Sequence, residues 1–382
     1  MTRKEFIKIC SLLGISFPLQ NIMAISNSNK PTNKFKGKVL IIGAGAAGLT
    51  AAYQLSQLGI DFQILEASSK FGGRLKTMND FVDFPIPLGA EWLHVEETIF
   101  DEIINNPKTK INIKLKGYNE NDYALYDGEE TSITDMGFDS DQKFIGSSWL
   151  DFFKEYILPT IQDKITYNQI VKSINYTSNE VIINTQNNVF KATKVIVTVP
   201  VKMLQNNTIT FTPQLPKNKQ KAIKKVTVWD GFKAFIEFSE KFYPSVTEFN
   251  VDGEKMYYDA SYGQKSDHNV LGLFIVGPVM KPYLQSTDTE IIRYILQELD
   301  ELFDYKASEN YIKHTSQNWS KEPFVEGAYV YNNESWRIVK TLSESVNNKL
   351  FFAGTAYTKG NDWGSVHSAA RSAIRTINEI LS

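Results

Sequence analysis

Three glycines near the start of the chain, Gly43, Gly45 and Gly48, stand at the spacing of a dinucleotide-binding loop. In such a loop the first glycine permits a tight turn, the second lets a diphosphate approach the main chain, and the third lets a helix pack on a strand. Glu66 follows about 20 residues later, where a carboxylate accepts hydrogen bonds from ribose hydroxyls. The pattern therefore predicts a cofactor that is an adenine dinucleotide.

The elements that position these residues follow from the apolar pattern. Lys38–Ile42 is predicted to be a buried parallel strand, followed by a helix over Ala46–Leu58. The first helical residues, Ala46 and Ala47, would present their N–H groups and the positive end of the helix dipole to phosphates. A second strand, Asp61–Ala67, would bring its last two residues to the cofactor.

Gly72, Gly73 and Arg74 follow directly after the acidic end of that strand. A second close approach of the main chain, together with a cation, suits a second contact to the diphosphate of a permanently bound cofactor. This favours FAD over NAD. The alternative for Arg74 taken alone is a surface ion pair.

Six motifs stand in the order found in one enzyme family: GAGAAG, GGR, LGAEWLH, VIVTVP, WSKEPFVEGAY, and FFAGTAY with WGSVHSAARSA. From Lys38 to Ser382 the chain resembles the flavin-containing amine oxidases, the group of the monoamine and polyamine oxidases. The resemblance implies an α/β fold, in which a Rossmann-like FAD-binding domain with a parallel sheet carries an inserted, mixed α+β substrate domain. It also implies noncovalent FAD, because Ala328 stands where some monoamine oxidases carry a cysteine bonded to the flavin.

The resemblance assigns several residues to the cofactor or to the substrate pocket. Trp92 and His94 would face or flank the pocket, although a core aromatic is the alternative for Trp92 alone. Val171 would touch the adenosine half of FAD, unless it belongs to the sheet core. The segment that runs beside the flavin ring would supply Leu88, Gly89 and Ala90, with Gly89 and Ala90 permitting close passage of the ring.

Lys233 lies in a strand pattern, Val228–Phe238, among alternating aromatic and aliphatic residues. A lysine in such a strand is usually at a sheet edge, with its ammonium group reaching water. The resemblance instead implies that Lys233 is linked through water to flavin N5, where burial lowers the pKa of the amine for proton transfer or oxygen activation. We therefore assign Lys233 as the catalytic residue.

The last two motifs complete the implied site. Trp319 would lie beside the flavin and Tyr329 in the substrate pocket, and a helix starting near Gly364 would direct its N–H groups at the flavin N1–C2=O edge. In two places the chain departs from the family: Thr355 and Ala356 replace an acidic residue, and Ser365 replaces an aromatic ring that Tyr357 or Trp363 would have to supply. The residues implied here are Gly354, Thr355, Gly364, Val366 and Ala369 at the cofactor and Trp363 in the pocket.

The reaction implied is hydride transfer from the carbon beside a neutral amine nitrogen to flavin N5, followed by imine hydrolysis and reoxidation by O2 with release of H2O2. An aromatic pocket would favour the neutral amine, because burial disfavours an ammonium ion. Two alternatives remain open: an FAD-dependent desaturase or protoporphyrinogen-type oxidase, and a noncatalytic FAD-binding protein. The sequence shows no clear acidic pair for a polyamine and no defined arginine for an amino-acid carboxylate.

The composition excludes other classes of protein. The chain has 382 residues, 42% hydrophobic and 22% charged, with a formal net charge of −2. It therefore lacks the basic excess of a nucleic-acid-binding protein. A single cysteine and four scattered histidines predict no zinc or iron site. The oligomeric state is left open.

Residues 1–26, MTRKEFIKICSLLGISFPLQNIMAIS, have the layout of a signal peptide. They resemble a twin-arginine signal in which Lys4 replaces the second arginine, and predict export, to a periplasm. The alternative is an N-terminal arm of a cytoplasmic protein. The apolar run is too short and too interrupted for a membrane span.

We expect residues 1–35 to be signal peptide and linker. The cofactor domain would comprise residues 36–95, 165–210 and 340–382, and the substrate domain residues 96–164 and 211–339. The first part of the substrate domain is shorter than is usual in the family, with a polar loop over Thr134–Phe144 and a helix over Ser148–Leu158. A second helix, capped by Thr287, is predicted over Thr287–Phe303.

Overall fold

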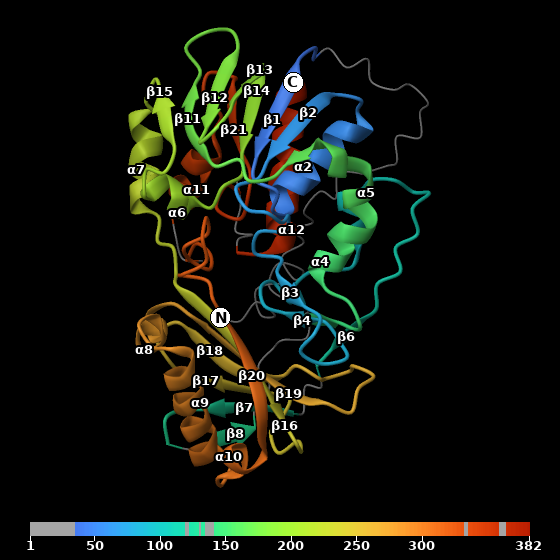
Figure 1. Cartoon of the computed structure of the whole chain (residues 1–382), viewed down its shortest axis with the longest axis vertical. Coiled ribbons are helices and arrows are strands. Elements are labelled where there is room, and N and C mark those ends of the chain that lie inside the picture. The colour runs from blue at the N-terminus through green and yellow to red at the C-terminus, as the bar shows by residue number, and fades with distance from the viewer. Residues whose placement is uncertain (1–34, 119–121, 130, 134–140, 332–334, 359–363) are drawn as a thin grey trace, which may run out of the picture. The chain divides into compact units, whose positions relative to one another are not determined.

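Five parallel strands form the first sheet of the computed structural model, which describes residues 35–118, 122–129, 131–133, 141–331, 335–358 and 364–382. Figure 1 shows blue, green and red strands in this sheet, because its members come from both ends of the chain. The parallel sheet confirms the predicted Rossmann-like α/β class. Its strand order is β10 (Ile165–Thr166), β2 (Asp61–Leu65), β1 (Lys38–Ile42), β14 (Lys194–Val197) and β21 (Leu350–Phe352).

Two long helices, α2 (Ala46–Gln57) and α12 (Val366–Leu381), pack against each other and share an apolar core with β1. Helix α2 ends one residue before the predicted Leu58. Helix α12 begins two residues after Gly364, because the Oγ of Ser365 accepts a hydrogen bond from the N–H of Ser368 at 3.4 Å and so caps the helix at that point.

A second sheet of four strands follows in the order β13 (Val189–Ala192), β12 (Val181–Thr185), β11 (Val171–Asn175) and β15 (Thr210–Thr212). Its buried side chains share an apolar core with β14 and β21 of the first sheet. The helices of this region are α6 (Val201–Gln205), α7 (Lys217–Lys225) and α11 (Trp336–Ser343), and α7 packs on α11.

Lys219 joins α7 to α11 with a buried amine. Its side chain is 2% exposed, and its Nζ donates hydrogen bonds to the carbonyl oxygens of Thr341 and Leu342 at 2.9 and 2.7 Å. Nζ also lies 3.9 Å from the centre of the Phe352 ring. These contacts favour the charged amine, but burial lowers the pKa of Lys219 to about 7.

This lowered pKa predicts a pH-dependent stability. Between about pH 7 and the pKa of an unfolded lysine, about 10.4, the unfolded chain binds more protons at Lys219 than the folded chain. The free energy of unfolding should therefore rise with pH relative to a Lys219→Met variant, by up to about 1.4 kcal/mol per pH unit. Urea unfolding of both proteins at pH 7 and pH 9.5 measures this difference. A difference that is independent of pH would contradict the buried, partly deprotonated amine.

The third sheet has seven strands and includes the strand that carries Lys233. Strand β16 lies inside it, between β20 and β19, and all eight of its residues are buried. The interpretation of Lys233 as an edge residue with its ammonium in water is therefore wrong, because strands on both sides cover it. The strand order is β20 (Tyr311–Asn318), β16 (Gly231–Phe238), β19 (Asn269–Val276), β18 (Glu254–Asp259), β17 (Val246–Phe249), β7 (Tyr123–Tyr126) and β8 (Thr131–Ile133).

Helix α9 (Asp288–Leu302) packs its apolar side chains into the core of this sheet. The predicted cap is confirmed, because Thr287 Oγ1 accepts from the N–H of Glu290 and the Glu290 carboxylate accepts from the N–H of Thr287 at 2.8 Å. The short helices α8 (Lys281–Leu284) and α10 (Lys306–Asn310) flank it along the chain.

Smaller elements connect these layers. The predicted helix over Ser148–Leu158 is confirmed as a continuous helical stretch of α4 (Trp149–Phe152), a π-helical turn (Phe153–Ile157) and α5 (Leu158–Ile161). The predicted loop over Thr134–Phe144 is wrong at its end, because Gln142–Phe144 forms β9, which pairs with β5 (Trp92–Leu93) and β6 (Leu115–Gly117). Residues 134–140 lie outside the described residues. The other short elements are β3 (Thr77–Met78), β4 (Ile86–Pro87) and α3 (Thr98–Ile104).

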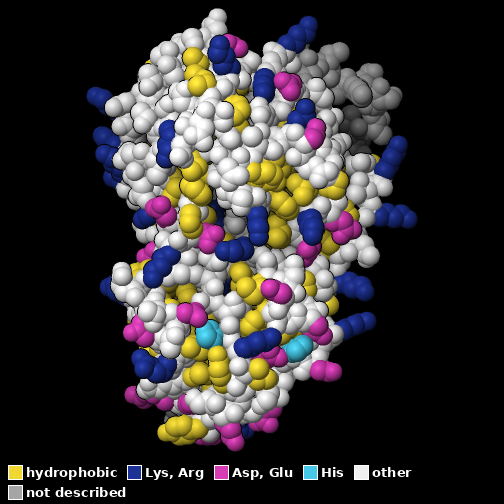
Figure 2. Space-filling view, viewed as in Figure 1, with side chains coloured by type: hydrophobic (Ala, Val, Ile, Leu, Met, Phe, Trp, Pro, Cys, Tyr) yellow, Lys and Arg dark blue, Asp and Glu magenta, His cyan; other side chains and the backbone are white. Residues whose placement is uncertain are grey.

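Positive and negative side chains are interspersed over the face shown in Figure 2. Among the described residues, no helix is long and apolar enough to cross a membrane, and no group of three or more His, Cys, Asp or Glu side chains is placed to hold a metal ion. The predicted signal peptide lies outside the described residues. The domain boundaries remain predictions.

Candidate functional site

The glycine loop between β1 and α2 leaves open space at its middle glycine. Gly43 has φ +108°, which favours glycine, and a Cβ on Gly48 would lie 2.0 Å from the carbonyl oxygen of Gly43. Gly45 differs from both. Its φ of −82° and ψ of −175° suit any residue, and the nearest atom to a Cβ there is 3.9 Å away. Neither the backbone conformation nor the neighbouring atoms demand glycine at position 45, so the space beside it is open to a bound group.

Helix α2 begins at this open space without a side-chain cap. The N–H groups of its first turn, which includes Ala46 and Ala47, therefore face a region suited to an anion. Glu66 lies beside the loop, where its Oε2 accepts from the N–H of Ala44 at 2.6 Å and its Oε1 accepts from the N–H of Ser68 at 2.9 Å. Ala67 joins Glu66 to Ser68.

A second glycine turn meets the first. The N–H of Gly72 donates to the carbonyl oxygen of Ala44 at 2.8 Å, and a Cβ on Gly73 would lie 3.5 Å from the Cα of Gly45. Side chains at Gly45 or Gly73 would therefore occupy the space between the two turns. The sequence predicted two close approaches to one diphosphate, and the structure brings the two turns together.

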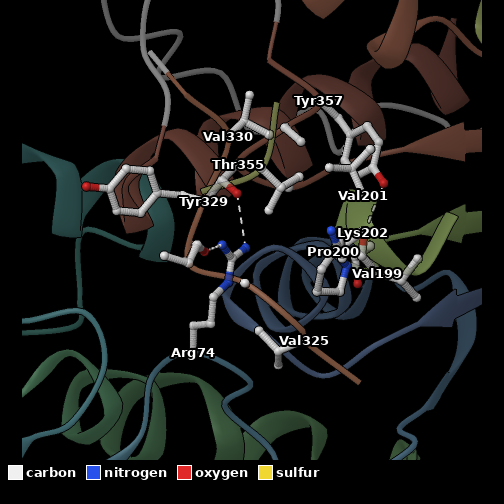
Figure 3. Close-up of a pocket in the computed structure, with 16 residues that line it drawn as sticks. Arg74, Val199, Pro200, Val201, Lys202, Val325, Tyr329, Val330, Thr355 and Tyr357 are labelled. Atoms are coloured by element: carbon white, nitrogen blue, oxygen red, sulfur yellow. Dashed lines mark hydrogen bonds between the residues drawn. The ribbon is translucent and has the colours of Figure 1, made fainter. Parts of the chain in front are cut away.

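Arg74 is a partly buried cation beside these turns (Figure 3). Its guanidinium donates to the carbonyl oxygen of Ala328 and, at 3.0 Å, to Thr355 Oγ1. Burial lowers its pKa to about 10. No carboxylate of the described residues forms a salt bridge with Arg74, so the surface ion pair considered as an alternative is not present among them. A partly buried guanidinium held, among the described residues, by neutral oxygens fits an anionic group such as a diphosphate.

A pocket adjoins Arg74 and collects segments that are far apart in the sequence (Figure 3). Gly354, with φ +142°, donates its N–H to Ser372 Oγ at 2.8 Å at the turn after β21. Tyr357 is buried in the wall and donates its hydroxyl to the carbonyl oxygen of Val199 at 3.0 Å. The lining comprises Arg74, Thr198–Lys202, Val228, Val325, Gly327–Val330 and Gly354–Tyr357.

The segment from Leu88 to Ala90 is fixed to Arg74 by its main chain. The N–H of Ala90 donates to the carbonyl oxygen of Arg74 at 3.1 Å, and Trp319 Nε1 donates to the carbonyl oxygen of Leu88 at 2.9 Å. A Cβ on Gly89 would lie 1.8 Å from that Arg74 oxygen. The close approach that requires glycine at position 89 is therefore to the Arg74 main chain, whereas the sequence predicted an approach to the flavin ring.

Lys233 is buried against the same segment. Its side chain is 3% exposed, and its Nζ donates to the carbonyl oxygens of Pro87 and Gly89 at 3.0 and 3.2 Å and to Glu91 Oε2 at 2.6 Å. Burial lowers the pKa of Lys233, and the Glu91 carboxylate opposes this shift. The amine thus touches the main chain of the predicted flavin-side segment.

Glu91 was missed by sequence reasoning, although it lies inside the LGAEWLH motif. Its side chain is 1% exposed, and its Oε2 also accepts from the hydroxyl of Tyr258 at 2.6 Å. A second buried lysine, Lys143 on β9, has its Nζ 3.8 Å from Glu91 Oε1. The sequence did offer one signal for Glu91: it is a carboxylate within an apolar motif, and a buried carboxylate requires a partner.

The predicted pocket residues are only partly brought together. The Trp92 ring packs edge-on against Tyr258, with ring centres 4.8 Å apart, and lies 5.1 Å from Lys233 Nζ. Tyr329 donates its hydroxyl to Glu254 Oε2 at 3.1 Å. His94 is largely exposed and bonds Asp141 Oδ1 at 2.8 Å. Trp363 lies outside the described residues.

The remaining predicted cofactor residues lie in the core or at the start of α12. Val171 is the first residue of β11 and is 6% exposed within the core that the two sheets share. This position agrees with the alternative interpretation of Val171 as a residue of the sheet core. Val366 and Ala369 belong to the core formed with α2. A Cβ on Gly364, with φ +74°, would lie 3.5 Å from the Tyr329 ring. Ser365 Oγ lies 2.9 Å from His367 Nε2, so a polar pair occupies the expected aromatic position.

The family model described as flavin containing amine oxidoreductase matches residues 46–159 and 153–381. This chain belongs to that family.

Relatives within the family are named for different activities. The chain is 22% identical to a probable polyamine oxidase 4 of Arabidopsis thaliana over 90% of this chain and 87% of the relative. It is 23% identical to lysine-specific histone demethylase 2 of Homo sapiens over 92% of this chain, and spans only 54% of that relative. The solved structure of wild-type putrescine oxidase bound to putrescine matches with a TM-score of 0.73 and 15% identity, covering 91% of this chain and 99% of the other. A cyclohexylamine oxidase from Brevibacterium oxydans matches with a TM-score of 0.74 and 15% identity, covering 90% and 98%.

As a member of this family the chain binds FAD. The residues present fit the cofactor: the open space at Gly45, the uncapped start of α2 and the partly buried Arg74 together form a cradle for a diphosphate. Glu66 lies where the ribose is expected, and Ala328 leaves no thiol for a covalent bond at that position. When bound, FAD supplies the hydride acceptor.

Proposed function

We propose that this chain oxidises an amine, with hydride passing from the carbon beside the nitrogen to FAD and with O2 as the final acceptor, which releases H2O2. The observation that carries the proposal is the burial of Lys233 against Pro87 and Gly89, on the segment that is itself bonded to Arg74 of the cofactor cradle. The amine of β16 thus contacts the segment that is hydrogen-bonded to the main chain of Arg74.

Aromatic side chains around this lysine support an amine as the substrate. Trp92 packs on Tyr258 and Phe274, and Trp319 is 5% exposed beside Leu88. Such walls exclude water and disfavour an ammonium ion, so they favour the neutral amine whose lone pair assists loss of hydride. The names of two relatives, polyamine oxidase and putrescine oxidase, agree with this substrate class.

Helix α12 supports the same chemistry from the cofactor side. Its first residue is Val366, and the positive end of a 16-residue helix stabilises negative charge that develops near its N-terminus. Lys233 would hold or move a proton at its Nζ. The protein therefore contributes orientation, exclusion of water and electrostatic stabilisation.

Anaerobic titration of the purified, FAD-loaded chain tests the proposal. The panel contains putrescine, spermidine, cyclohexylamine and a methylated lysine peptide, which represent the activities for which the relatives are named. At least one amine should bleach the flavin absorbance, and admitting O2 should restore the colour with release of H2O2. A bound flavin that is reduced by light but by none of these amines would overturn the proposal and favour the noncatalytic alternative. Bleaching without peroxide on reoxidation would refute O2 as the acceptor.

A further inference from the structure

A buried cluster of two lysines and one carboxylate lies at the contact between three elements. Glu91 stands between β4 and β5, Lys233 on β16 and Lys143 on β9, and their side chains are 1%, 3% and 3% exposed. The carboxylate can balance the charge of only one of the two lysines. A second buried ammonium ion would be strongly disfavoured unless another anion served it.

The hydrogen bonds of Lys233 are those of an ammonium ion. A protonated lysine has three N–H donors. Lys233 Nζ has three acceptors within 3.2 Å, namely the carbonyl oxygens of Pro87 and Gly89 and the Oε2 of Glu91. Every donor of the charged amine therefore has a partner, and Lys233 with Glu91 forms the ion pair.

The hydrogen bonds of Lys143 are those of a neutral amine. Its Nζ contacts two acceptors, the carbonyl oxygens of Ala260 and, at 3.5 Å, Asp259. A neutral amine has two N–H donors and a lone pair. Glu91 Oε1 is 3.8 Å from this nitrogen, beyond a hydrogen bond, and has no hydrogen-bond partner in the described structure. Lys143 Nζ therefore makes no third donated hydrogen bond, and the nearest acceptor for one, Glu91 Oε1, is unused.

Other charged groups near Lys143 already have partners or point to water. The Asp259 carboxylate accepts from Lys241 Nζ at 2.8 Å and from the N–H of Ser261 at 2.9 Å. Burial holds the pKa of both Tyr118 and Tyr258 well above the usual range, so these hydroxyls stay neutral. The titratable groups that face or flank Lys143 are Glu91, Lys233, Asp259, Lys241, Tyr118, Tyr258, His94, Asp141 and the exposed Lys116 of β6.

We propose that Lys143 is a proton acceptor of this site, held as a neutral amine beside the Glu91–Lys233 ion pair and protonated when negative charge arrives at the cofactor. The new N–H bond would be donated to Glu91 Oε1, and closing 3.8 Å to hydrogen-bond distance requires a shift of about 1 Å. Burial lowers the pKa of Lys143, and Glu91 and Asp259 oppose this shift.

The proton balance rests on the proposed function. A neutral amine that gives up a hydride leaves an iminium ion, which loses one N–H proton to become the imine. When bound, FAD would supply the hydride acceptor, and the site would then carry one additional negative charge. Lys143–NH2 takes up one proton as Lys143–NH3+, so the net charge of the buried site does not change.

The pH dependence of the reduction potential tests the proposal without any amine substrate. The FAD-loaded chain is reduced by dithionite against a reference dye between pH 7.5 and pH 9.5. A two-electron couple that takes up one proton shifts by 29.6 mV for each tenfold change in proton concentration, and uptake of a second proton doubles this slope. We expect the doubled slope in the wild-type chain and in Lys116→Met, and the single slope in Lys143→Met. A single slope in the wild-type chain, or a doubled slope that survives Lys143→Met, would overturn the proposal.

If the chain retains no FAD, that result contradicts the proposed function but leaves this inference open to a second measurement. In the full chain labelled with 15N at lysine side chains, a neutral-amine Nζ resonance at pH 7.5 should disappear in Lys143→Met, whereas the resonance of the other deprotonating buried lysine should disappear only in Lys219→Met. Spectra in which no neutral-amine resonance is lost in Lys143→Met would refute the assignment.

Discussion

Gly45→Val should abolish retention of FAD while leaving the fold intact. The backbone at Gly45 is extended, with φ −82°, so valine introduces no strain, and the nearest atom to its Cβ is 3.9 Å away. The side chain would instead fill the space in front of the first turn of α2, where the diphosphate is expected. We expect the affinity for FAD to fall by at least about 100-fold, or about 2.7 kcal/mol. The free energy of unfolding of the FAD-free chain should change by no more than about 1 kcal/mol.

Fluorescence titration with FAD and urea unfolding measure these two quantities. Gly48→Ala is the matched control, because its Cβ would lie 2.0 Å from the carbonyl oxygen of Gly43 and would force β1 and α2 apart. That variant should lose stability as well as FAD. A Gly45→Val protein that is purified yellow, with wild-type affinity, would show that no diphosphate lies over this glycine.

Glu91→Gln should lower the free energy of unfolding by about 3–5 kcal/mol near pH 6, because it leaves the buried Lys233 ammonium without its counter-ion. The loss should shrink as the pH rises toward 10. Without Glu91 the folded pKa of Lys233 falls further below its unfolded value, so the unfolded state binds more protons and stability increases with pH up to about 10.4. Urea unfolding at pH 6 and pH 9.5 measures the change.

Two variants separate this effect from simple loss of packing. Glu91→Gln combined with Lys233→Met removes both charges, and should recover most of the lost stability. Glu97→Gln, an exposed carboxylate on the same segment, should change stability by less than about 0.5 kcal/mol. A loss in Glu91→Gln that is below 1 kcal/mol, or that is equal at both pH values, would mean that Lys233 is not charged in the folded chain.

Local patterns predicted the cofactor half of the fold well. The apolar run and the glycine spacing placed β1 at its observed bounds and α2 within one residue, because both signals lie within 20 residues of chain. The burial of Lys233 was not predictable in this way. It depends on the pairing of β16 with β19 and β20, which is decided by strands that are distant in the sequence.

The charged cluster lay beyond sequence reasoning for the same reason. Glu91 and Lys233 are 142 positions apart, and neither has a local pattern that indicates the other. Lys143 was placed in a loop, and becomes part of β9 only because β5 and β6 supply its hydrogen-bonding partners. Gly89 makes a close approach to the Arg74 main chain, which no local pattern indicated, and the predicted passage of the flavin ring at this glycine stays a prediction.

The packing of α12 on α2, with β21 closing the first sheet, has a consequence for synthesis of the chain. Helix α2 is synthesised about 300 residues before α12, although α3, α4 and α5, which share its core, follow sooner. The apolar face of α2 that packs on α12 therefore stays uncovered until α12 has been synthesised. A chaperone that shields this face would act between the synthesis of α2 and that of α12.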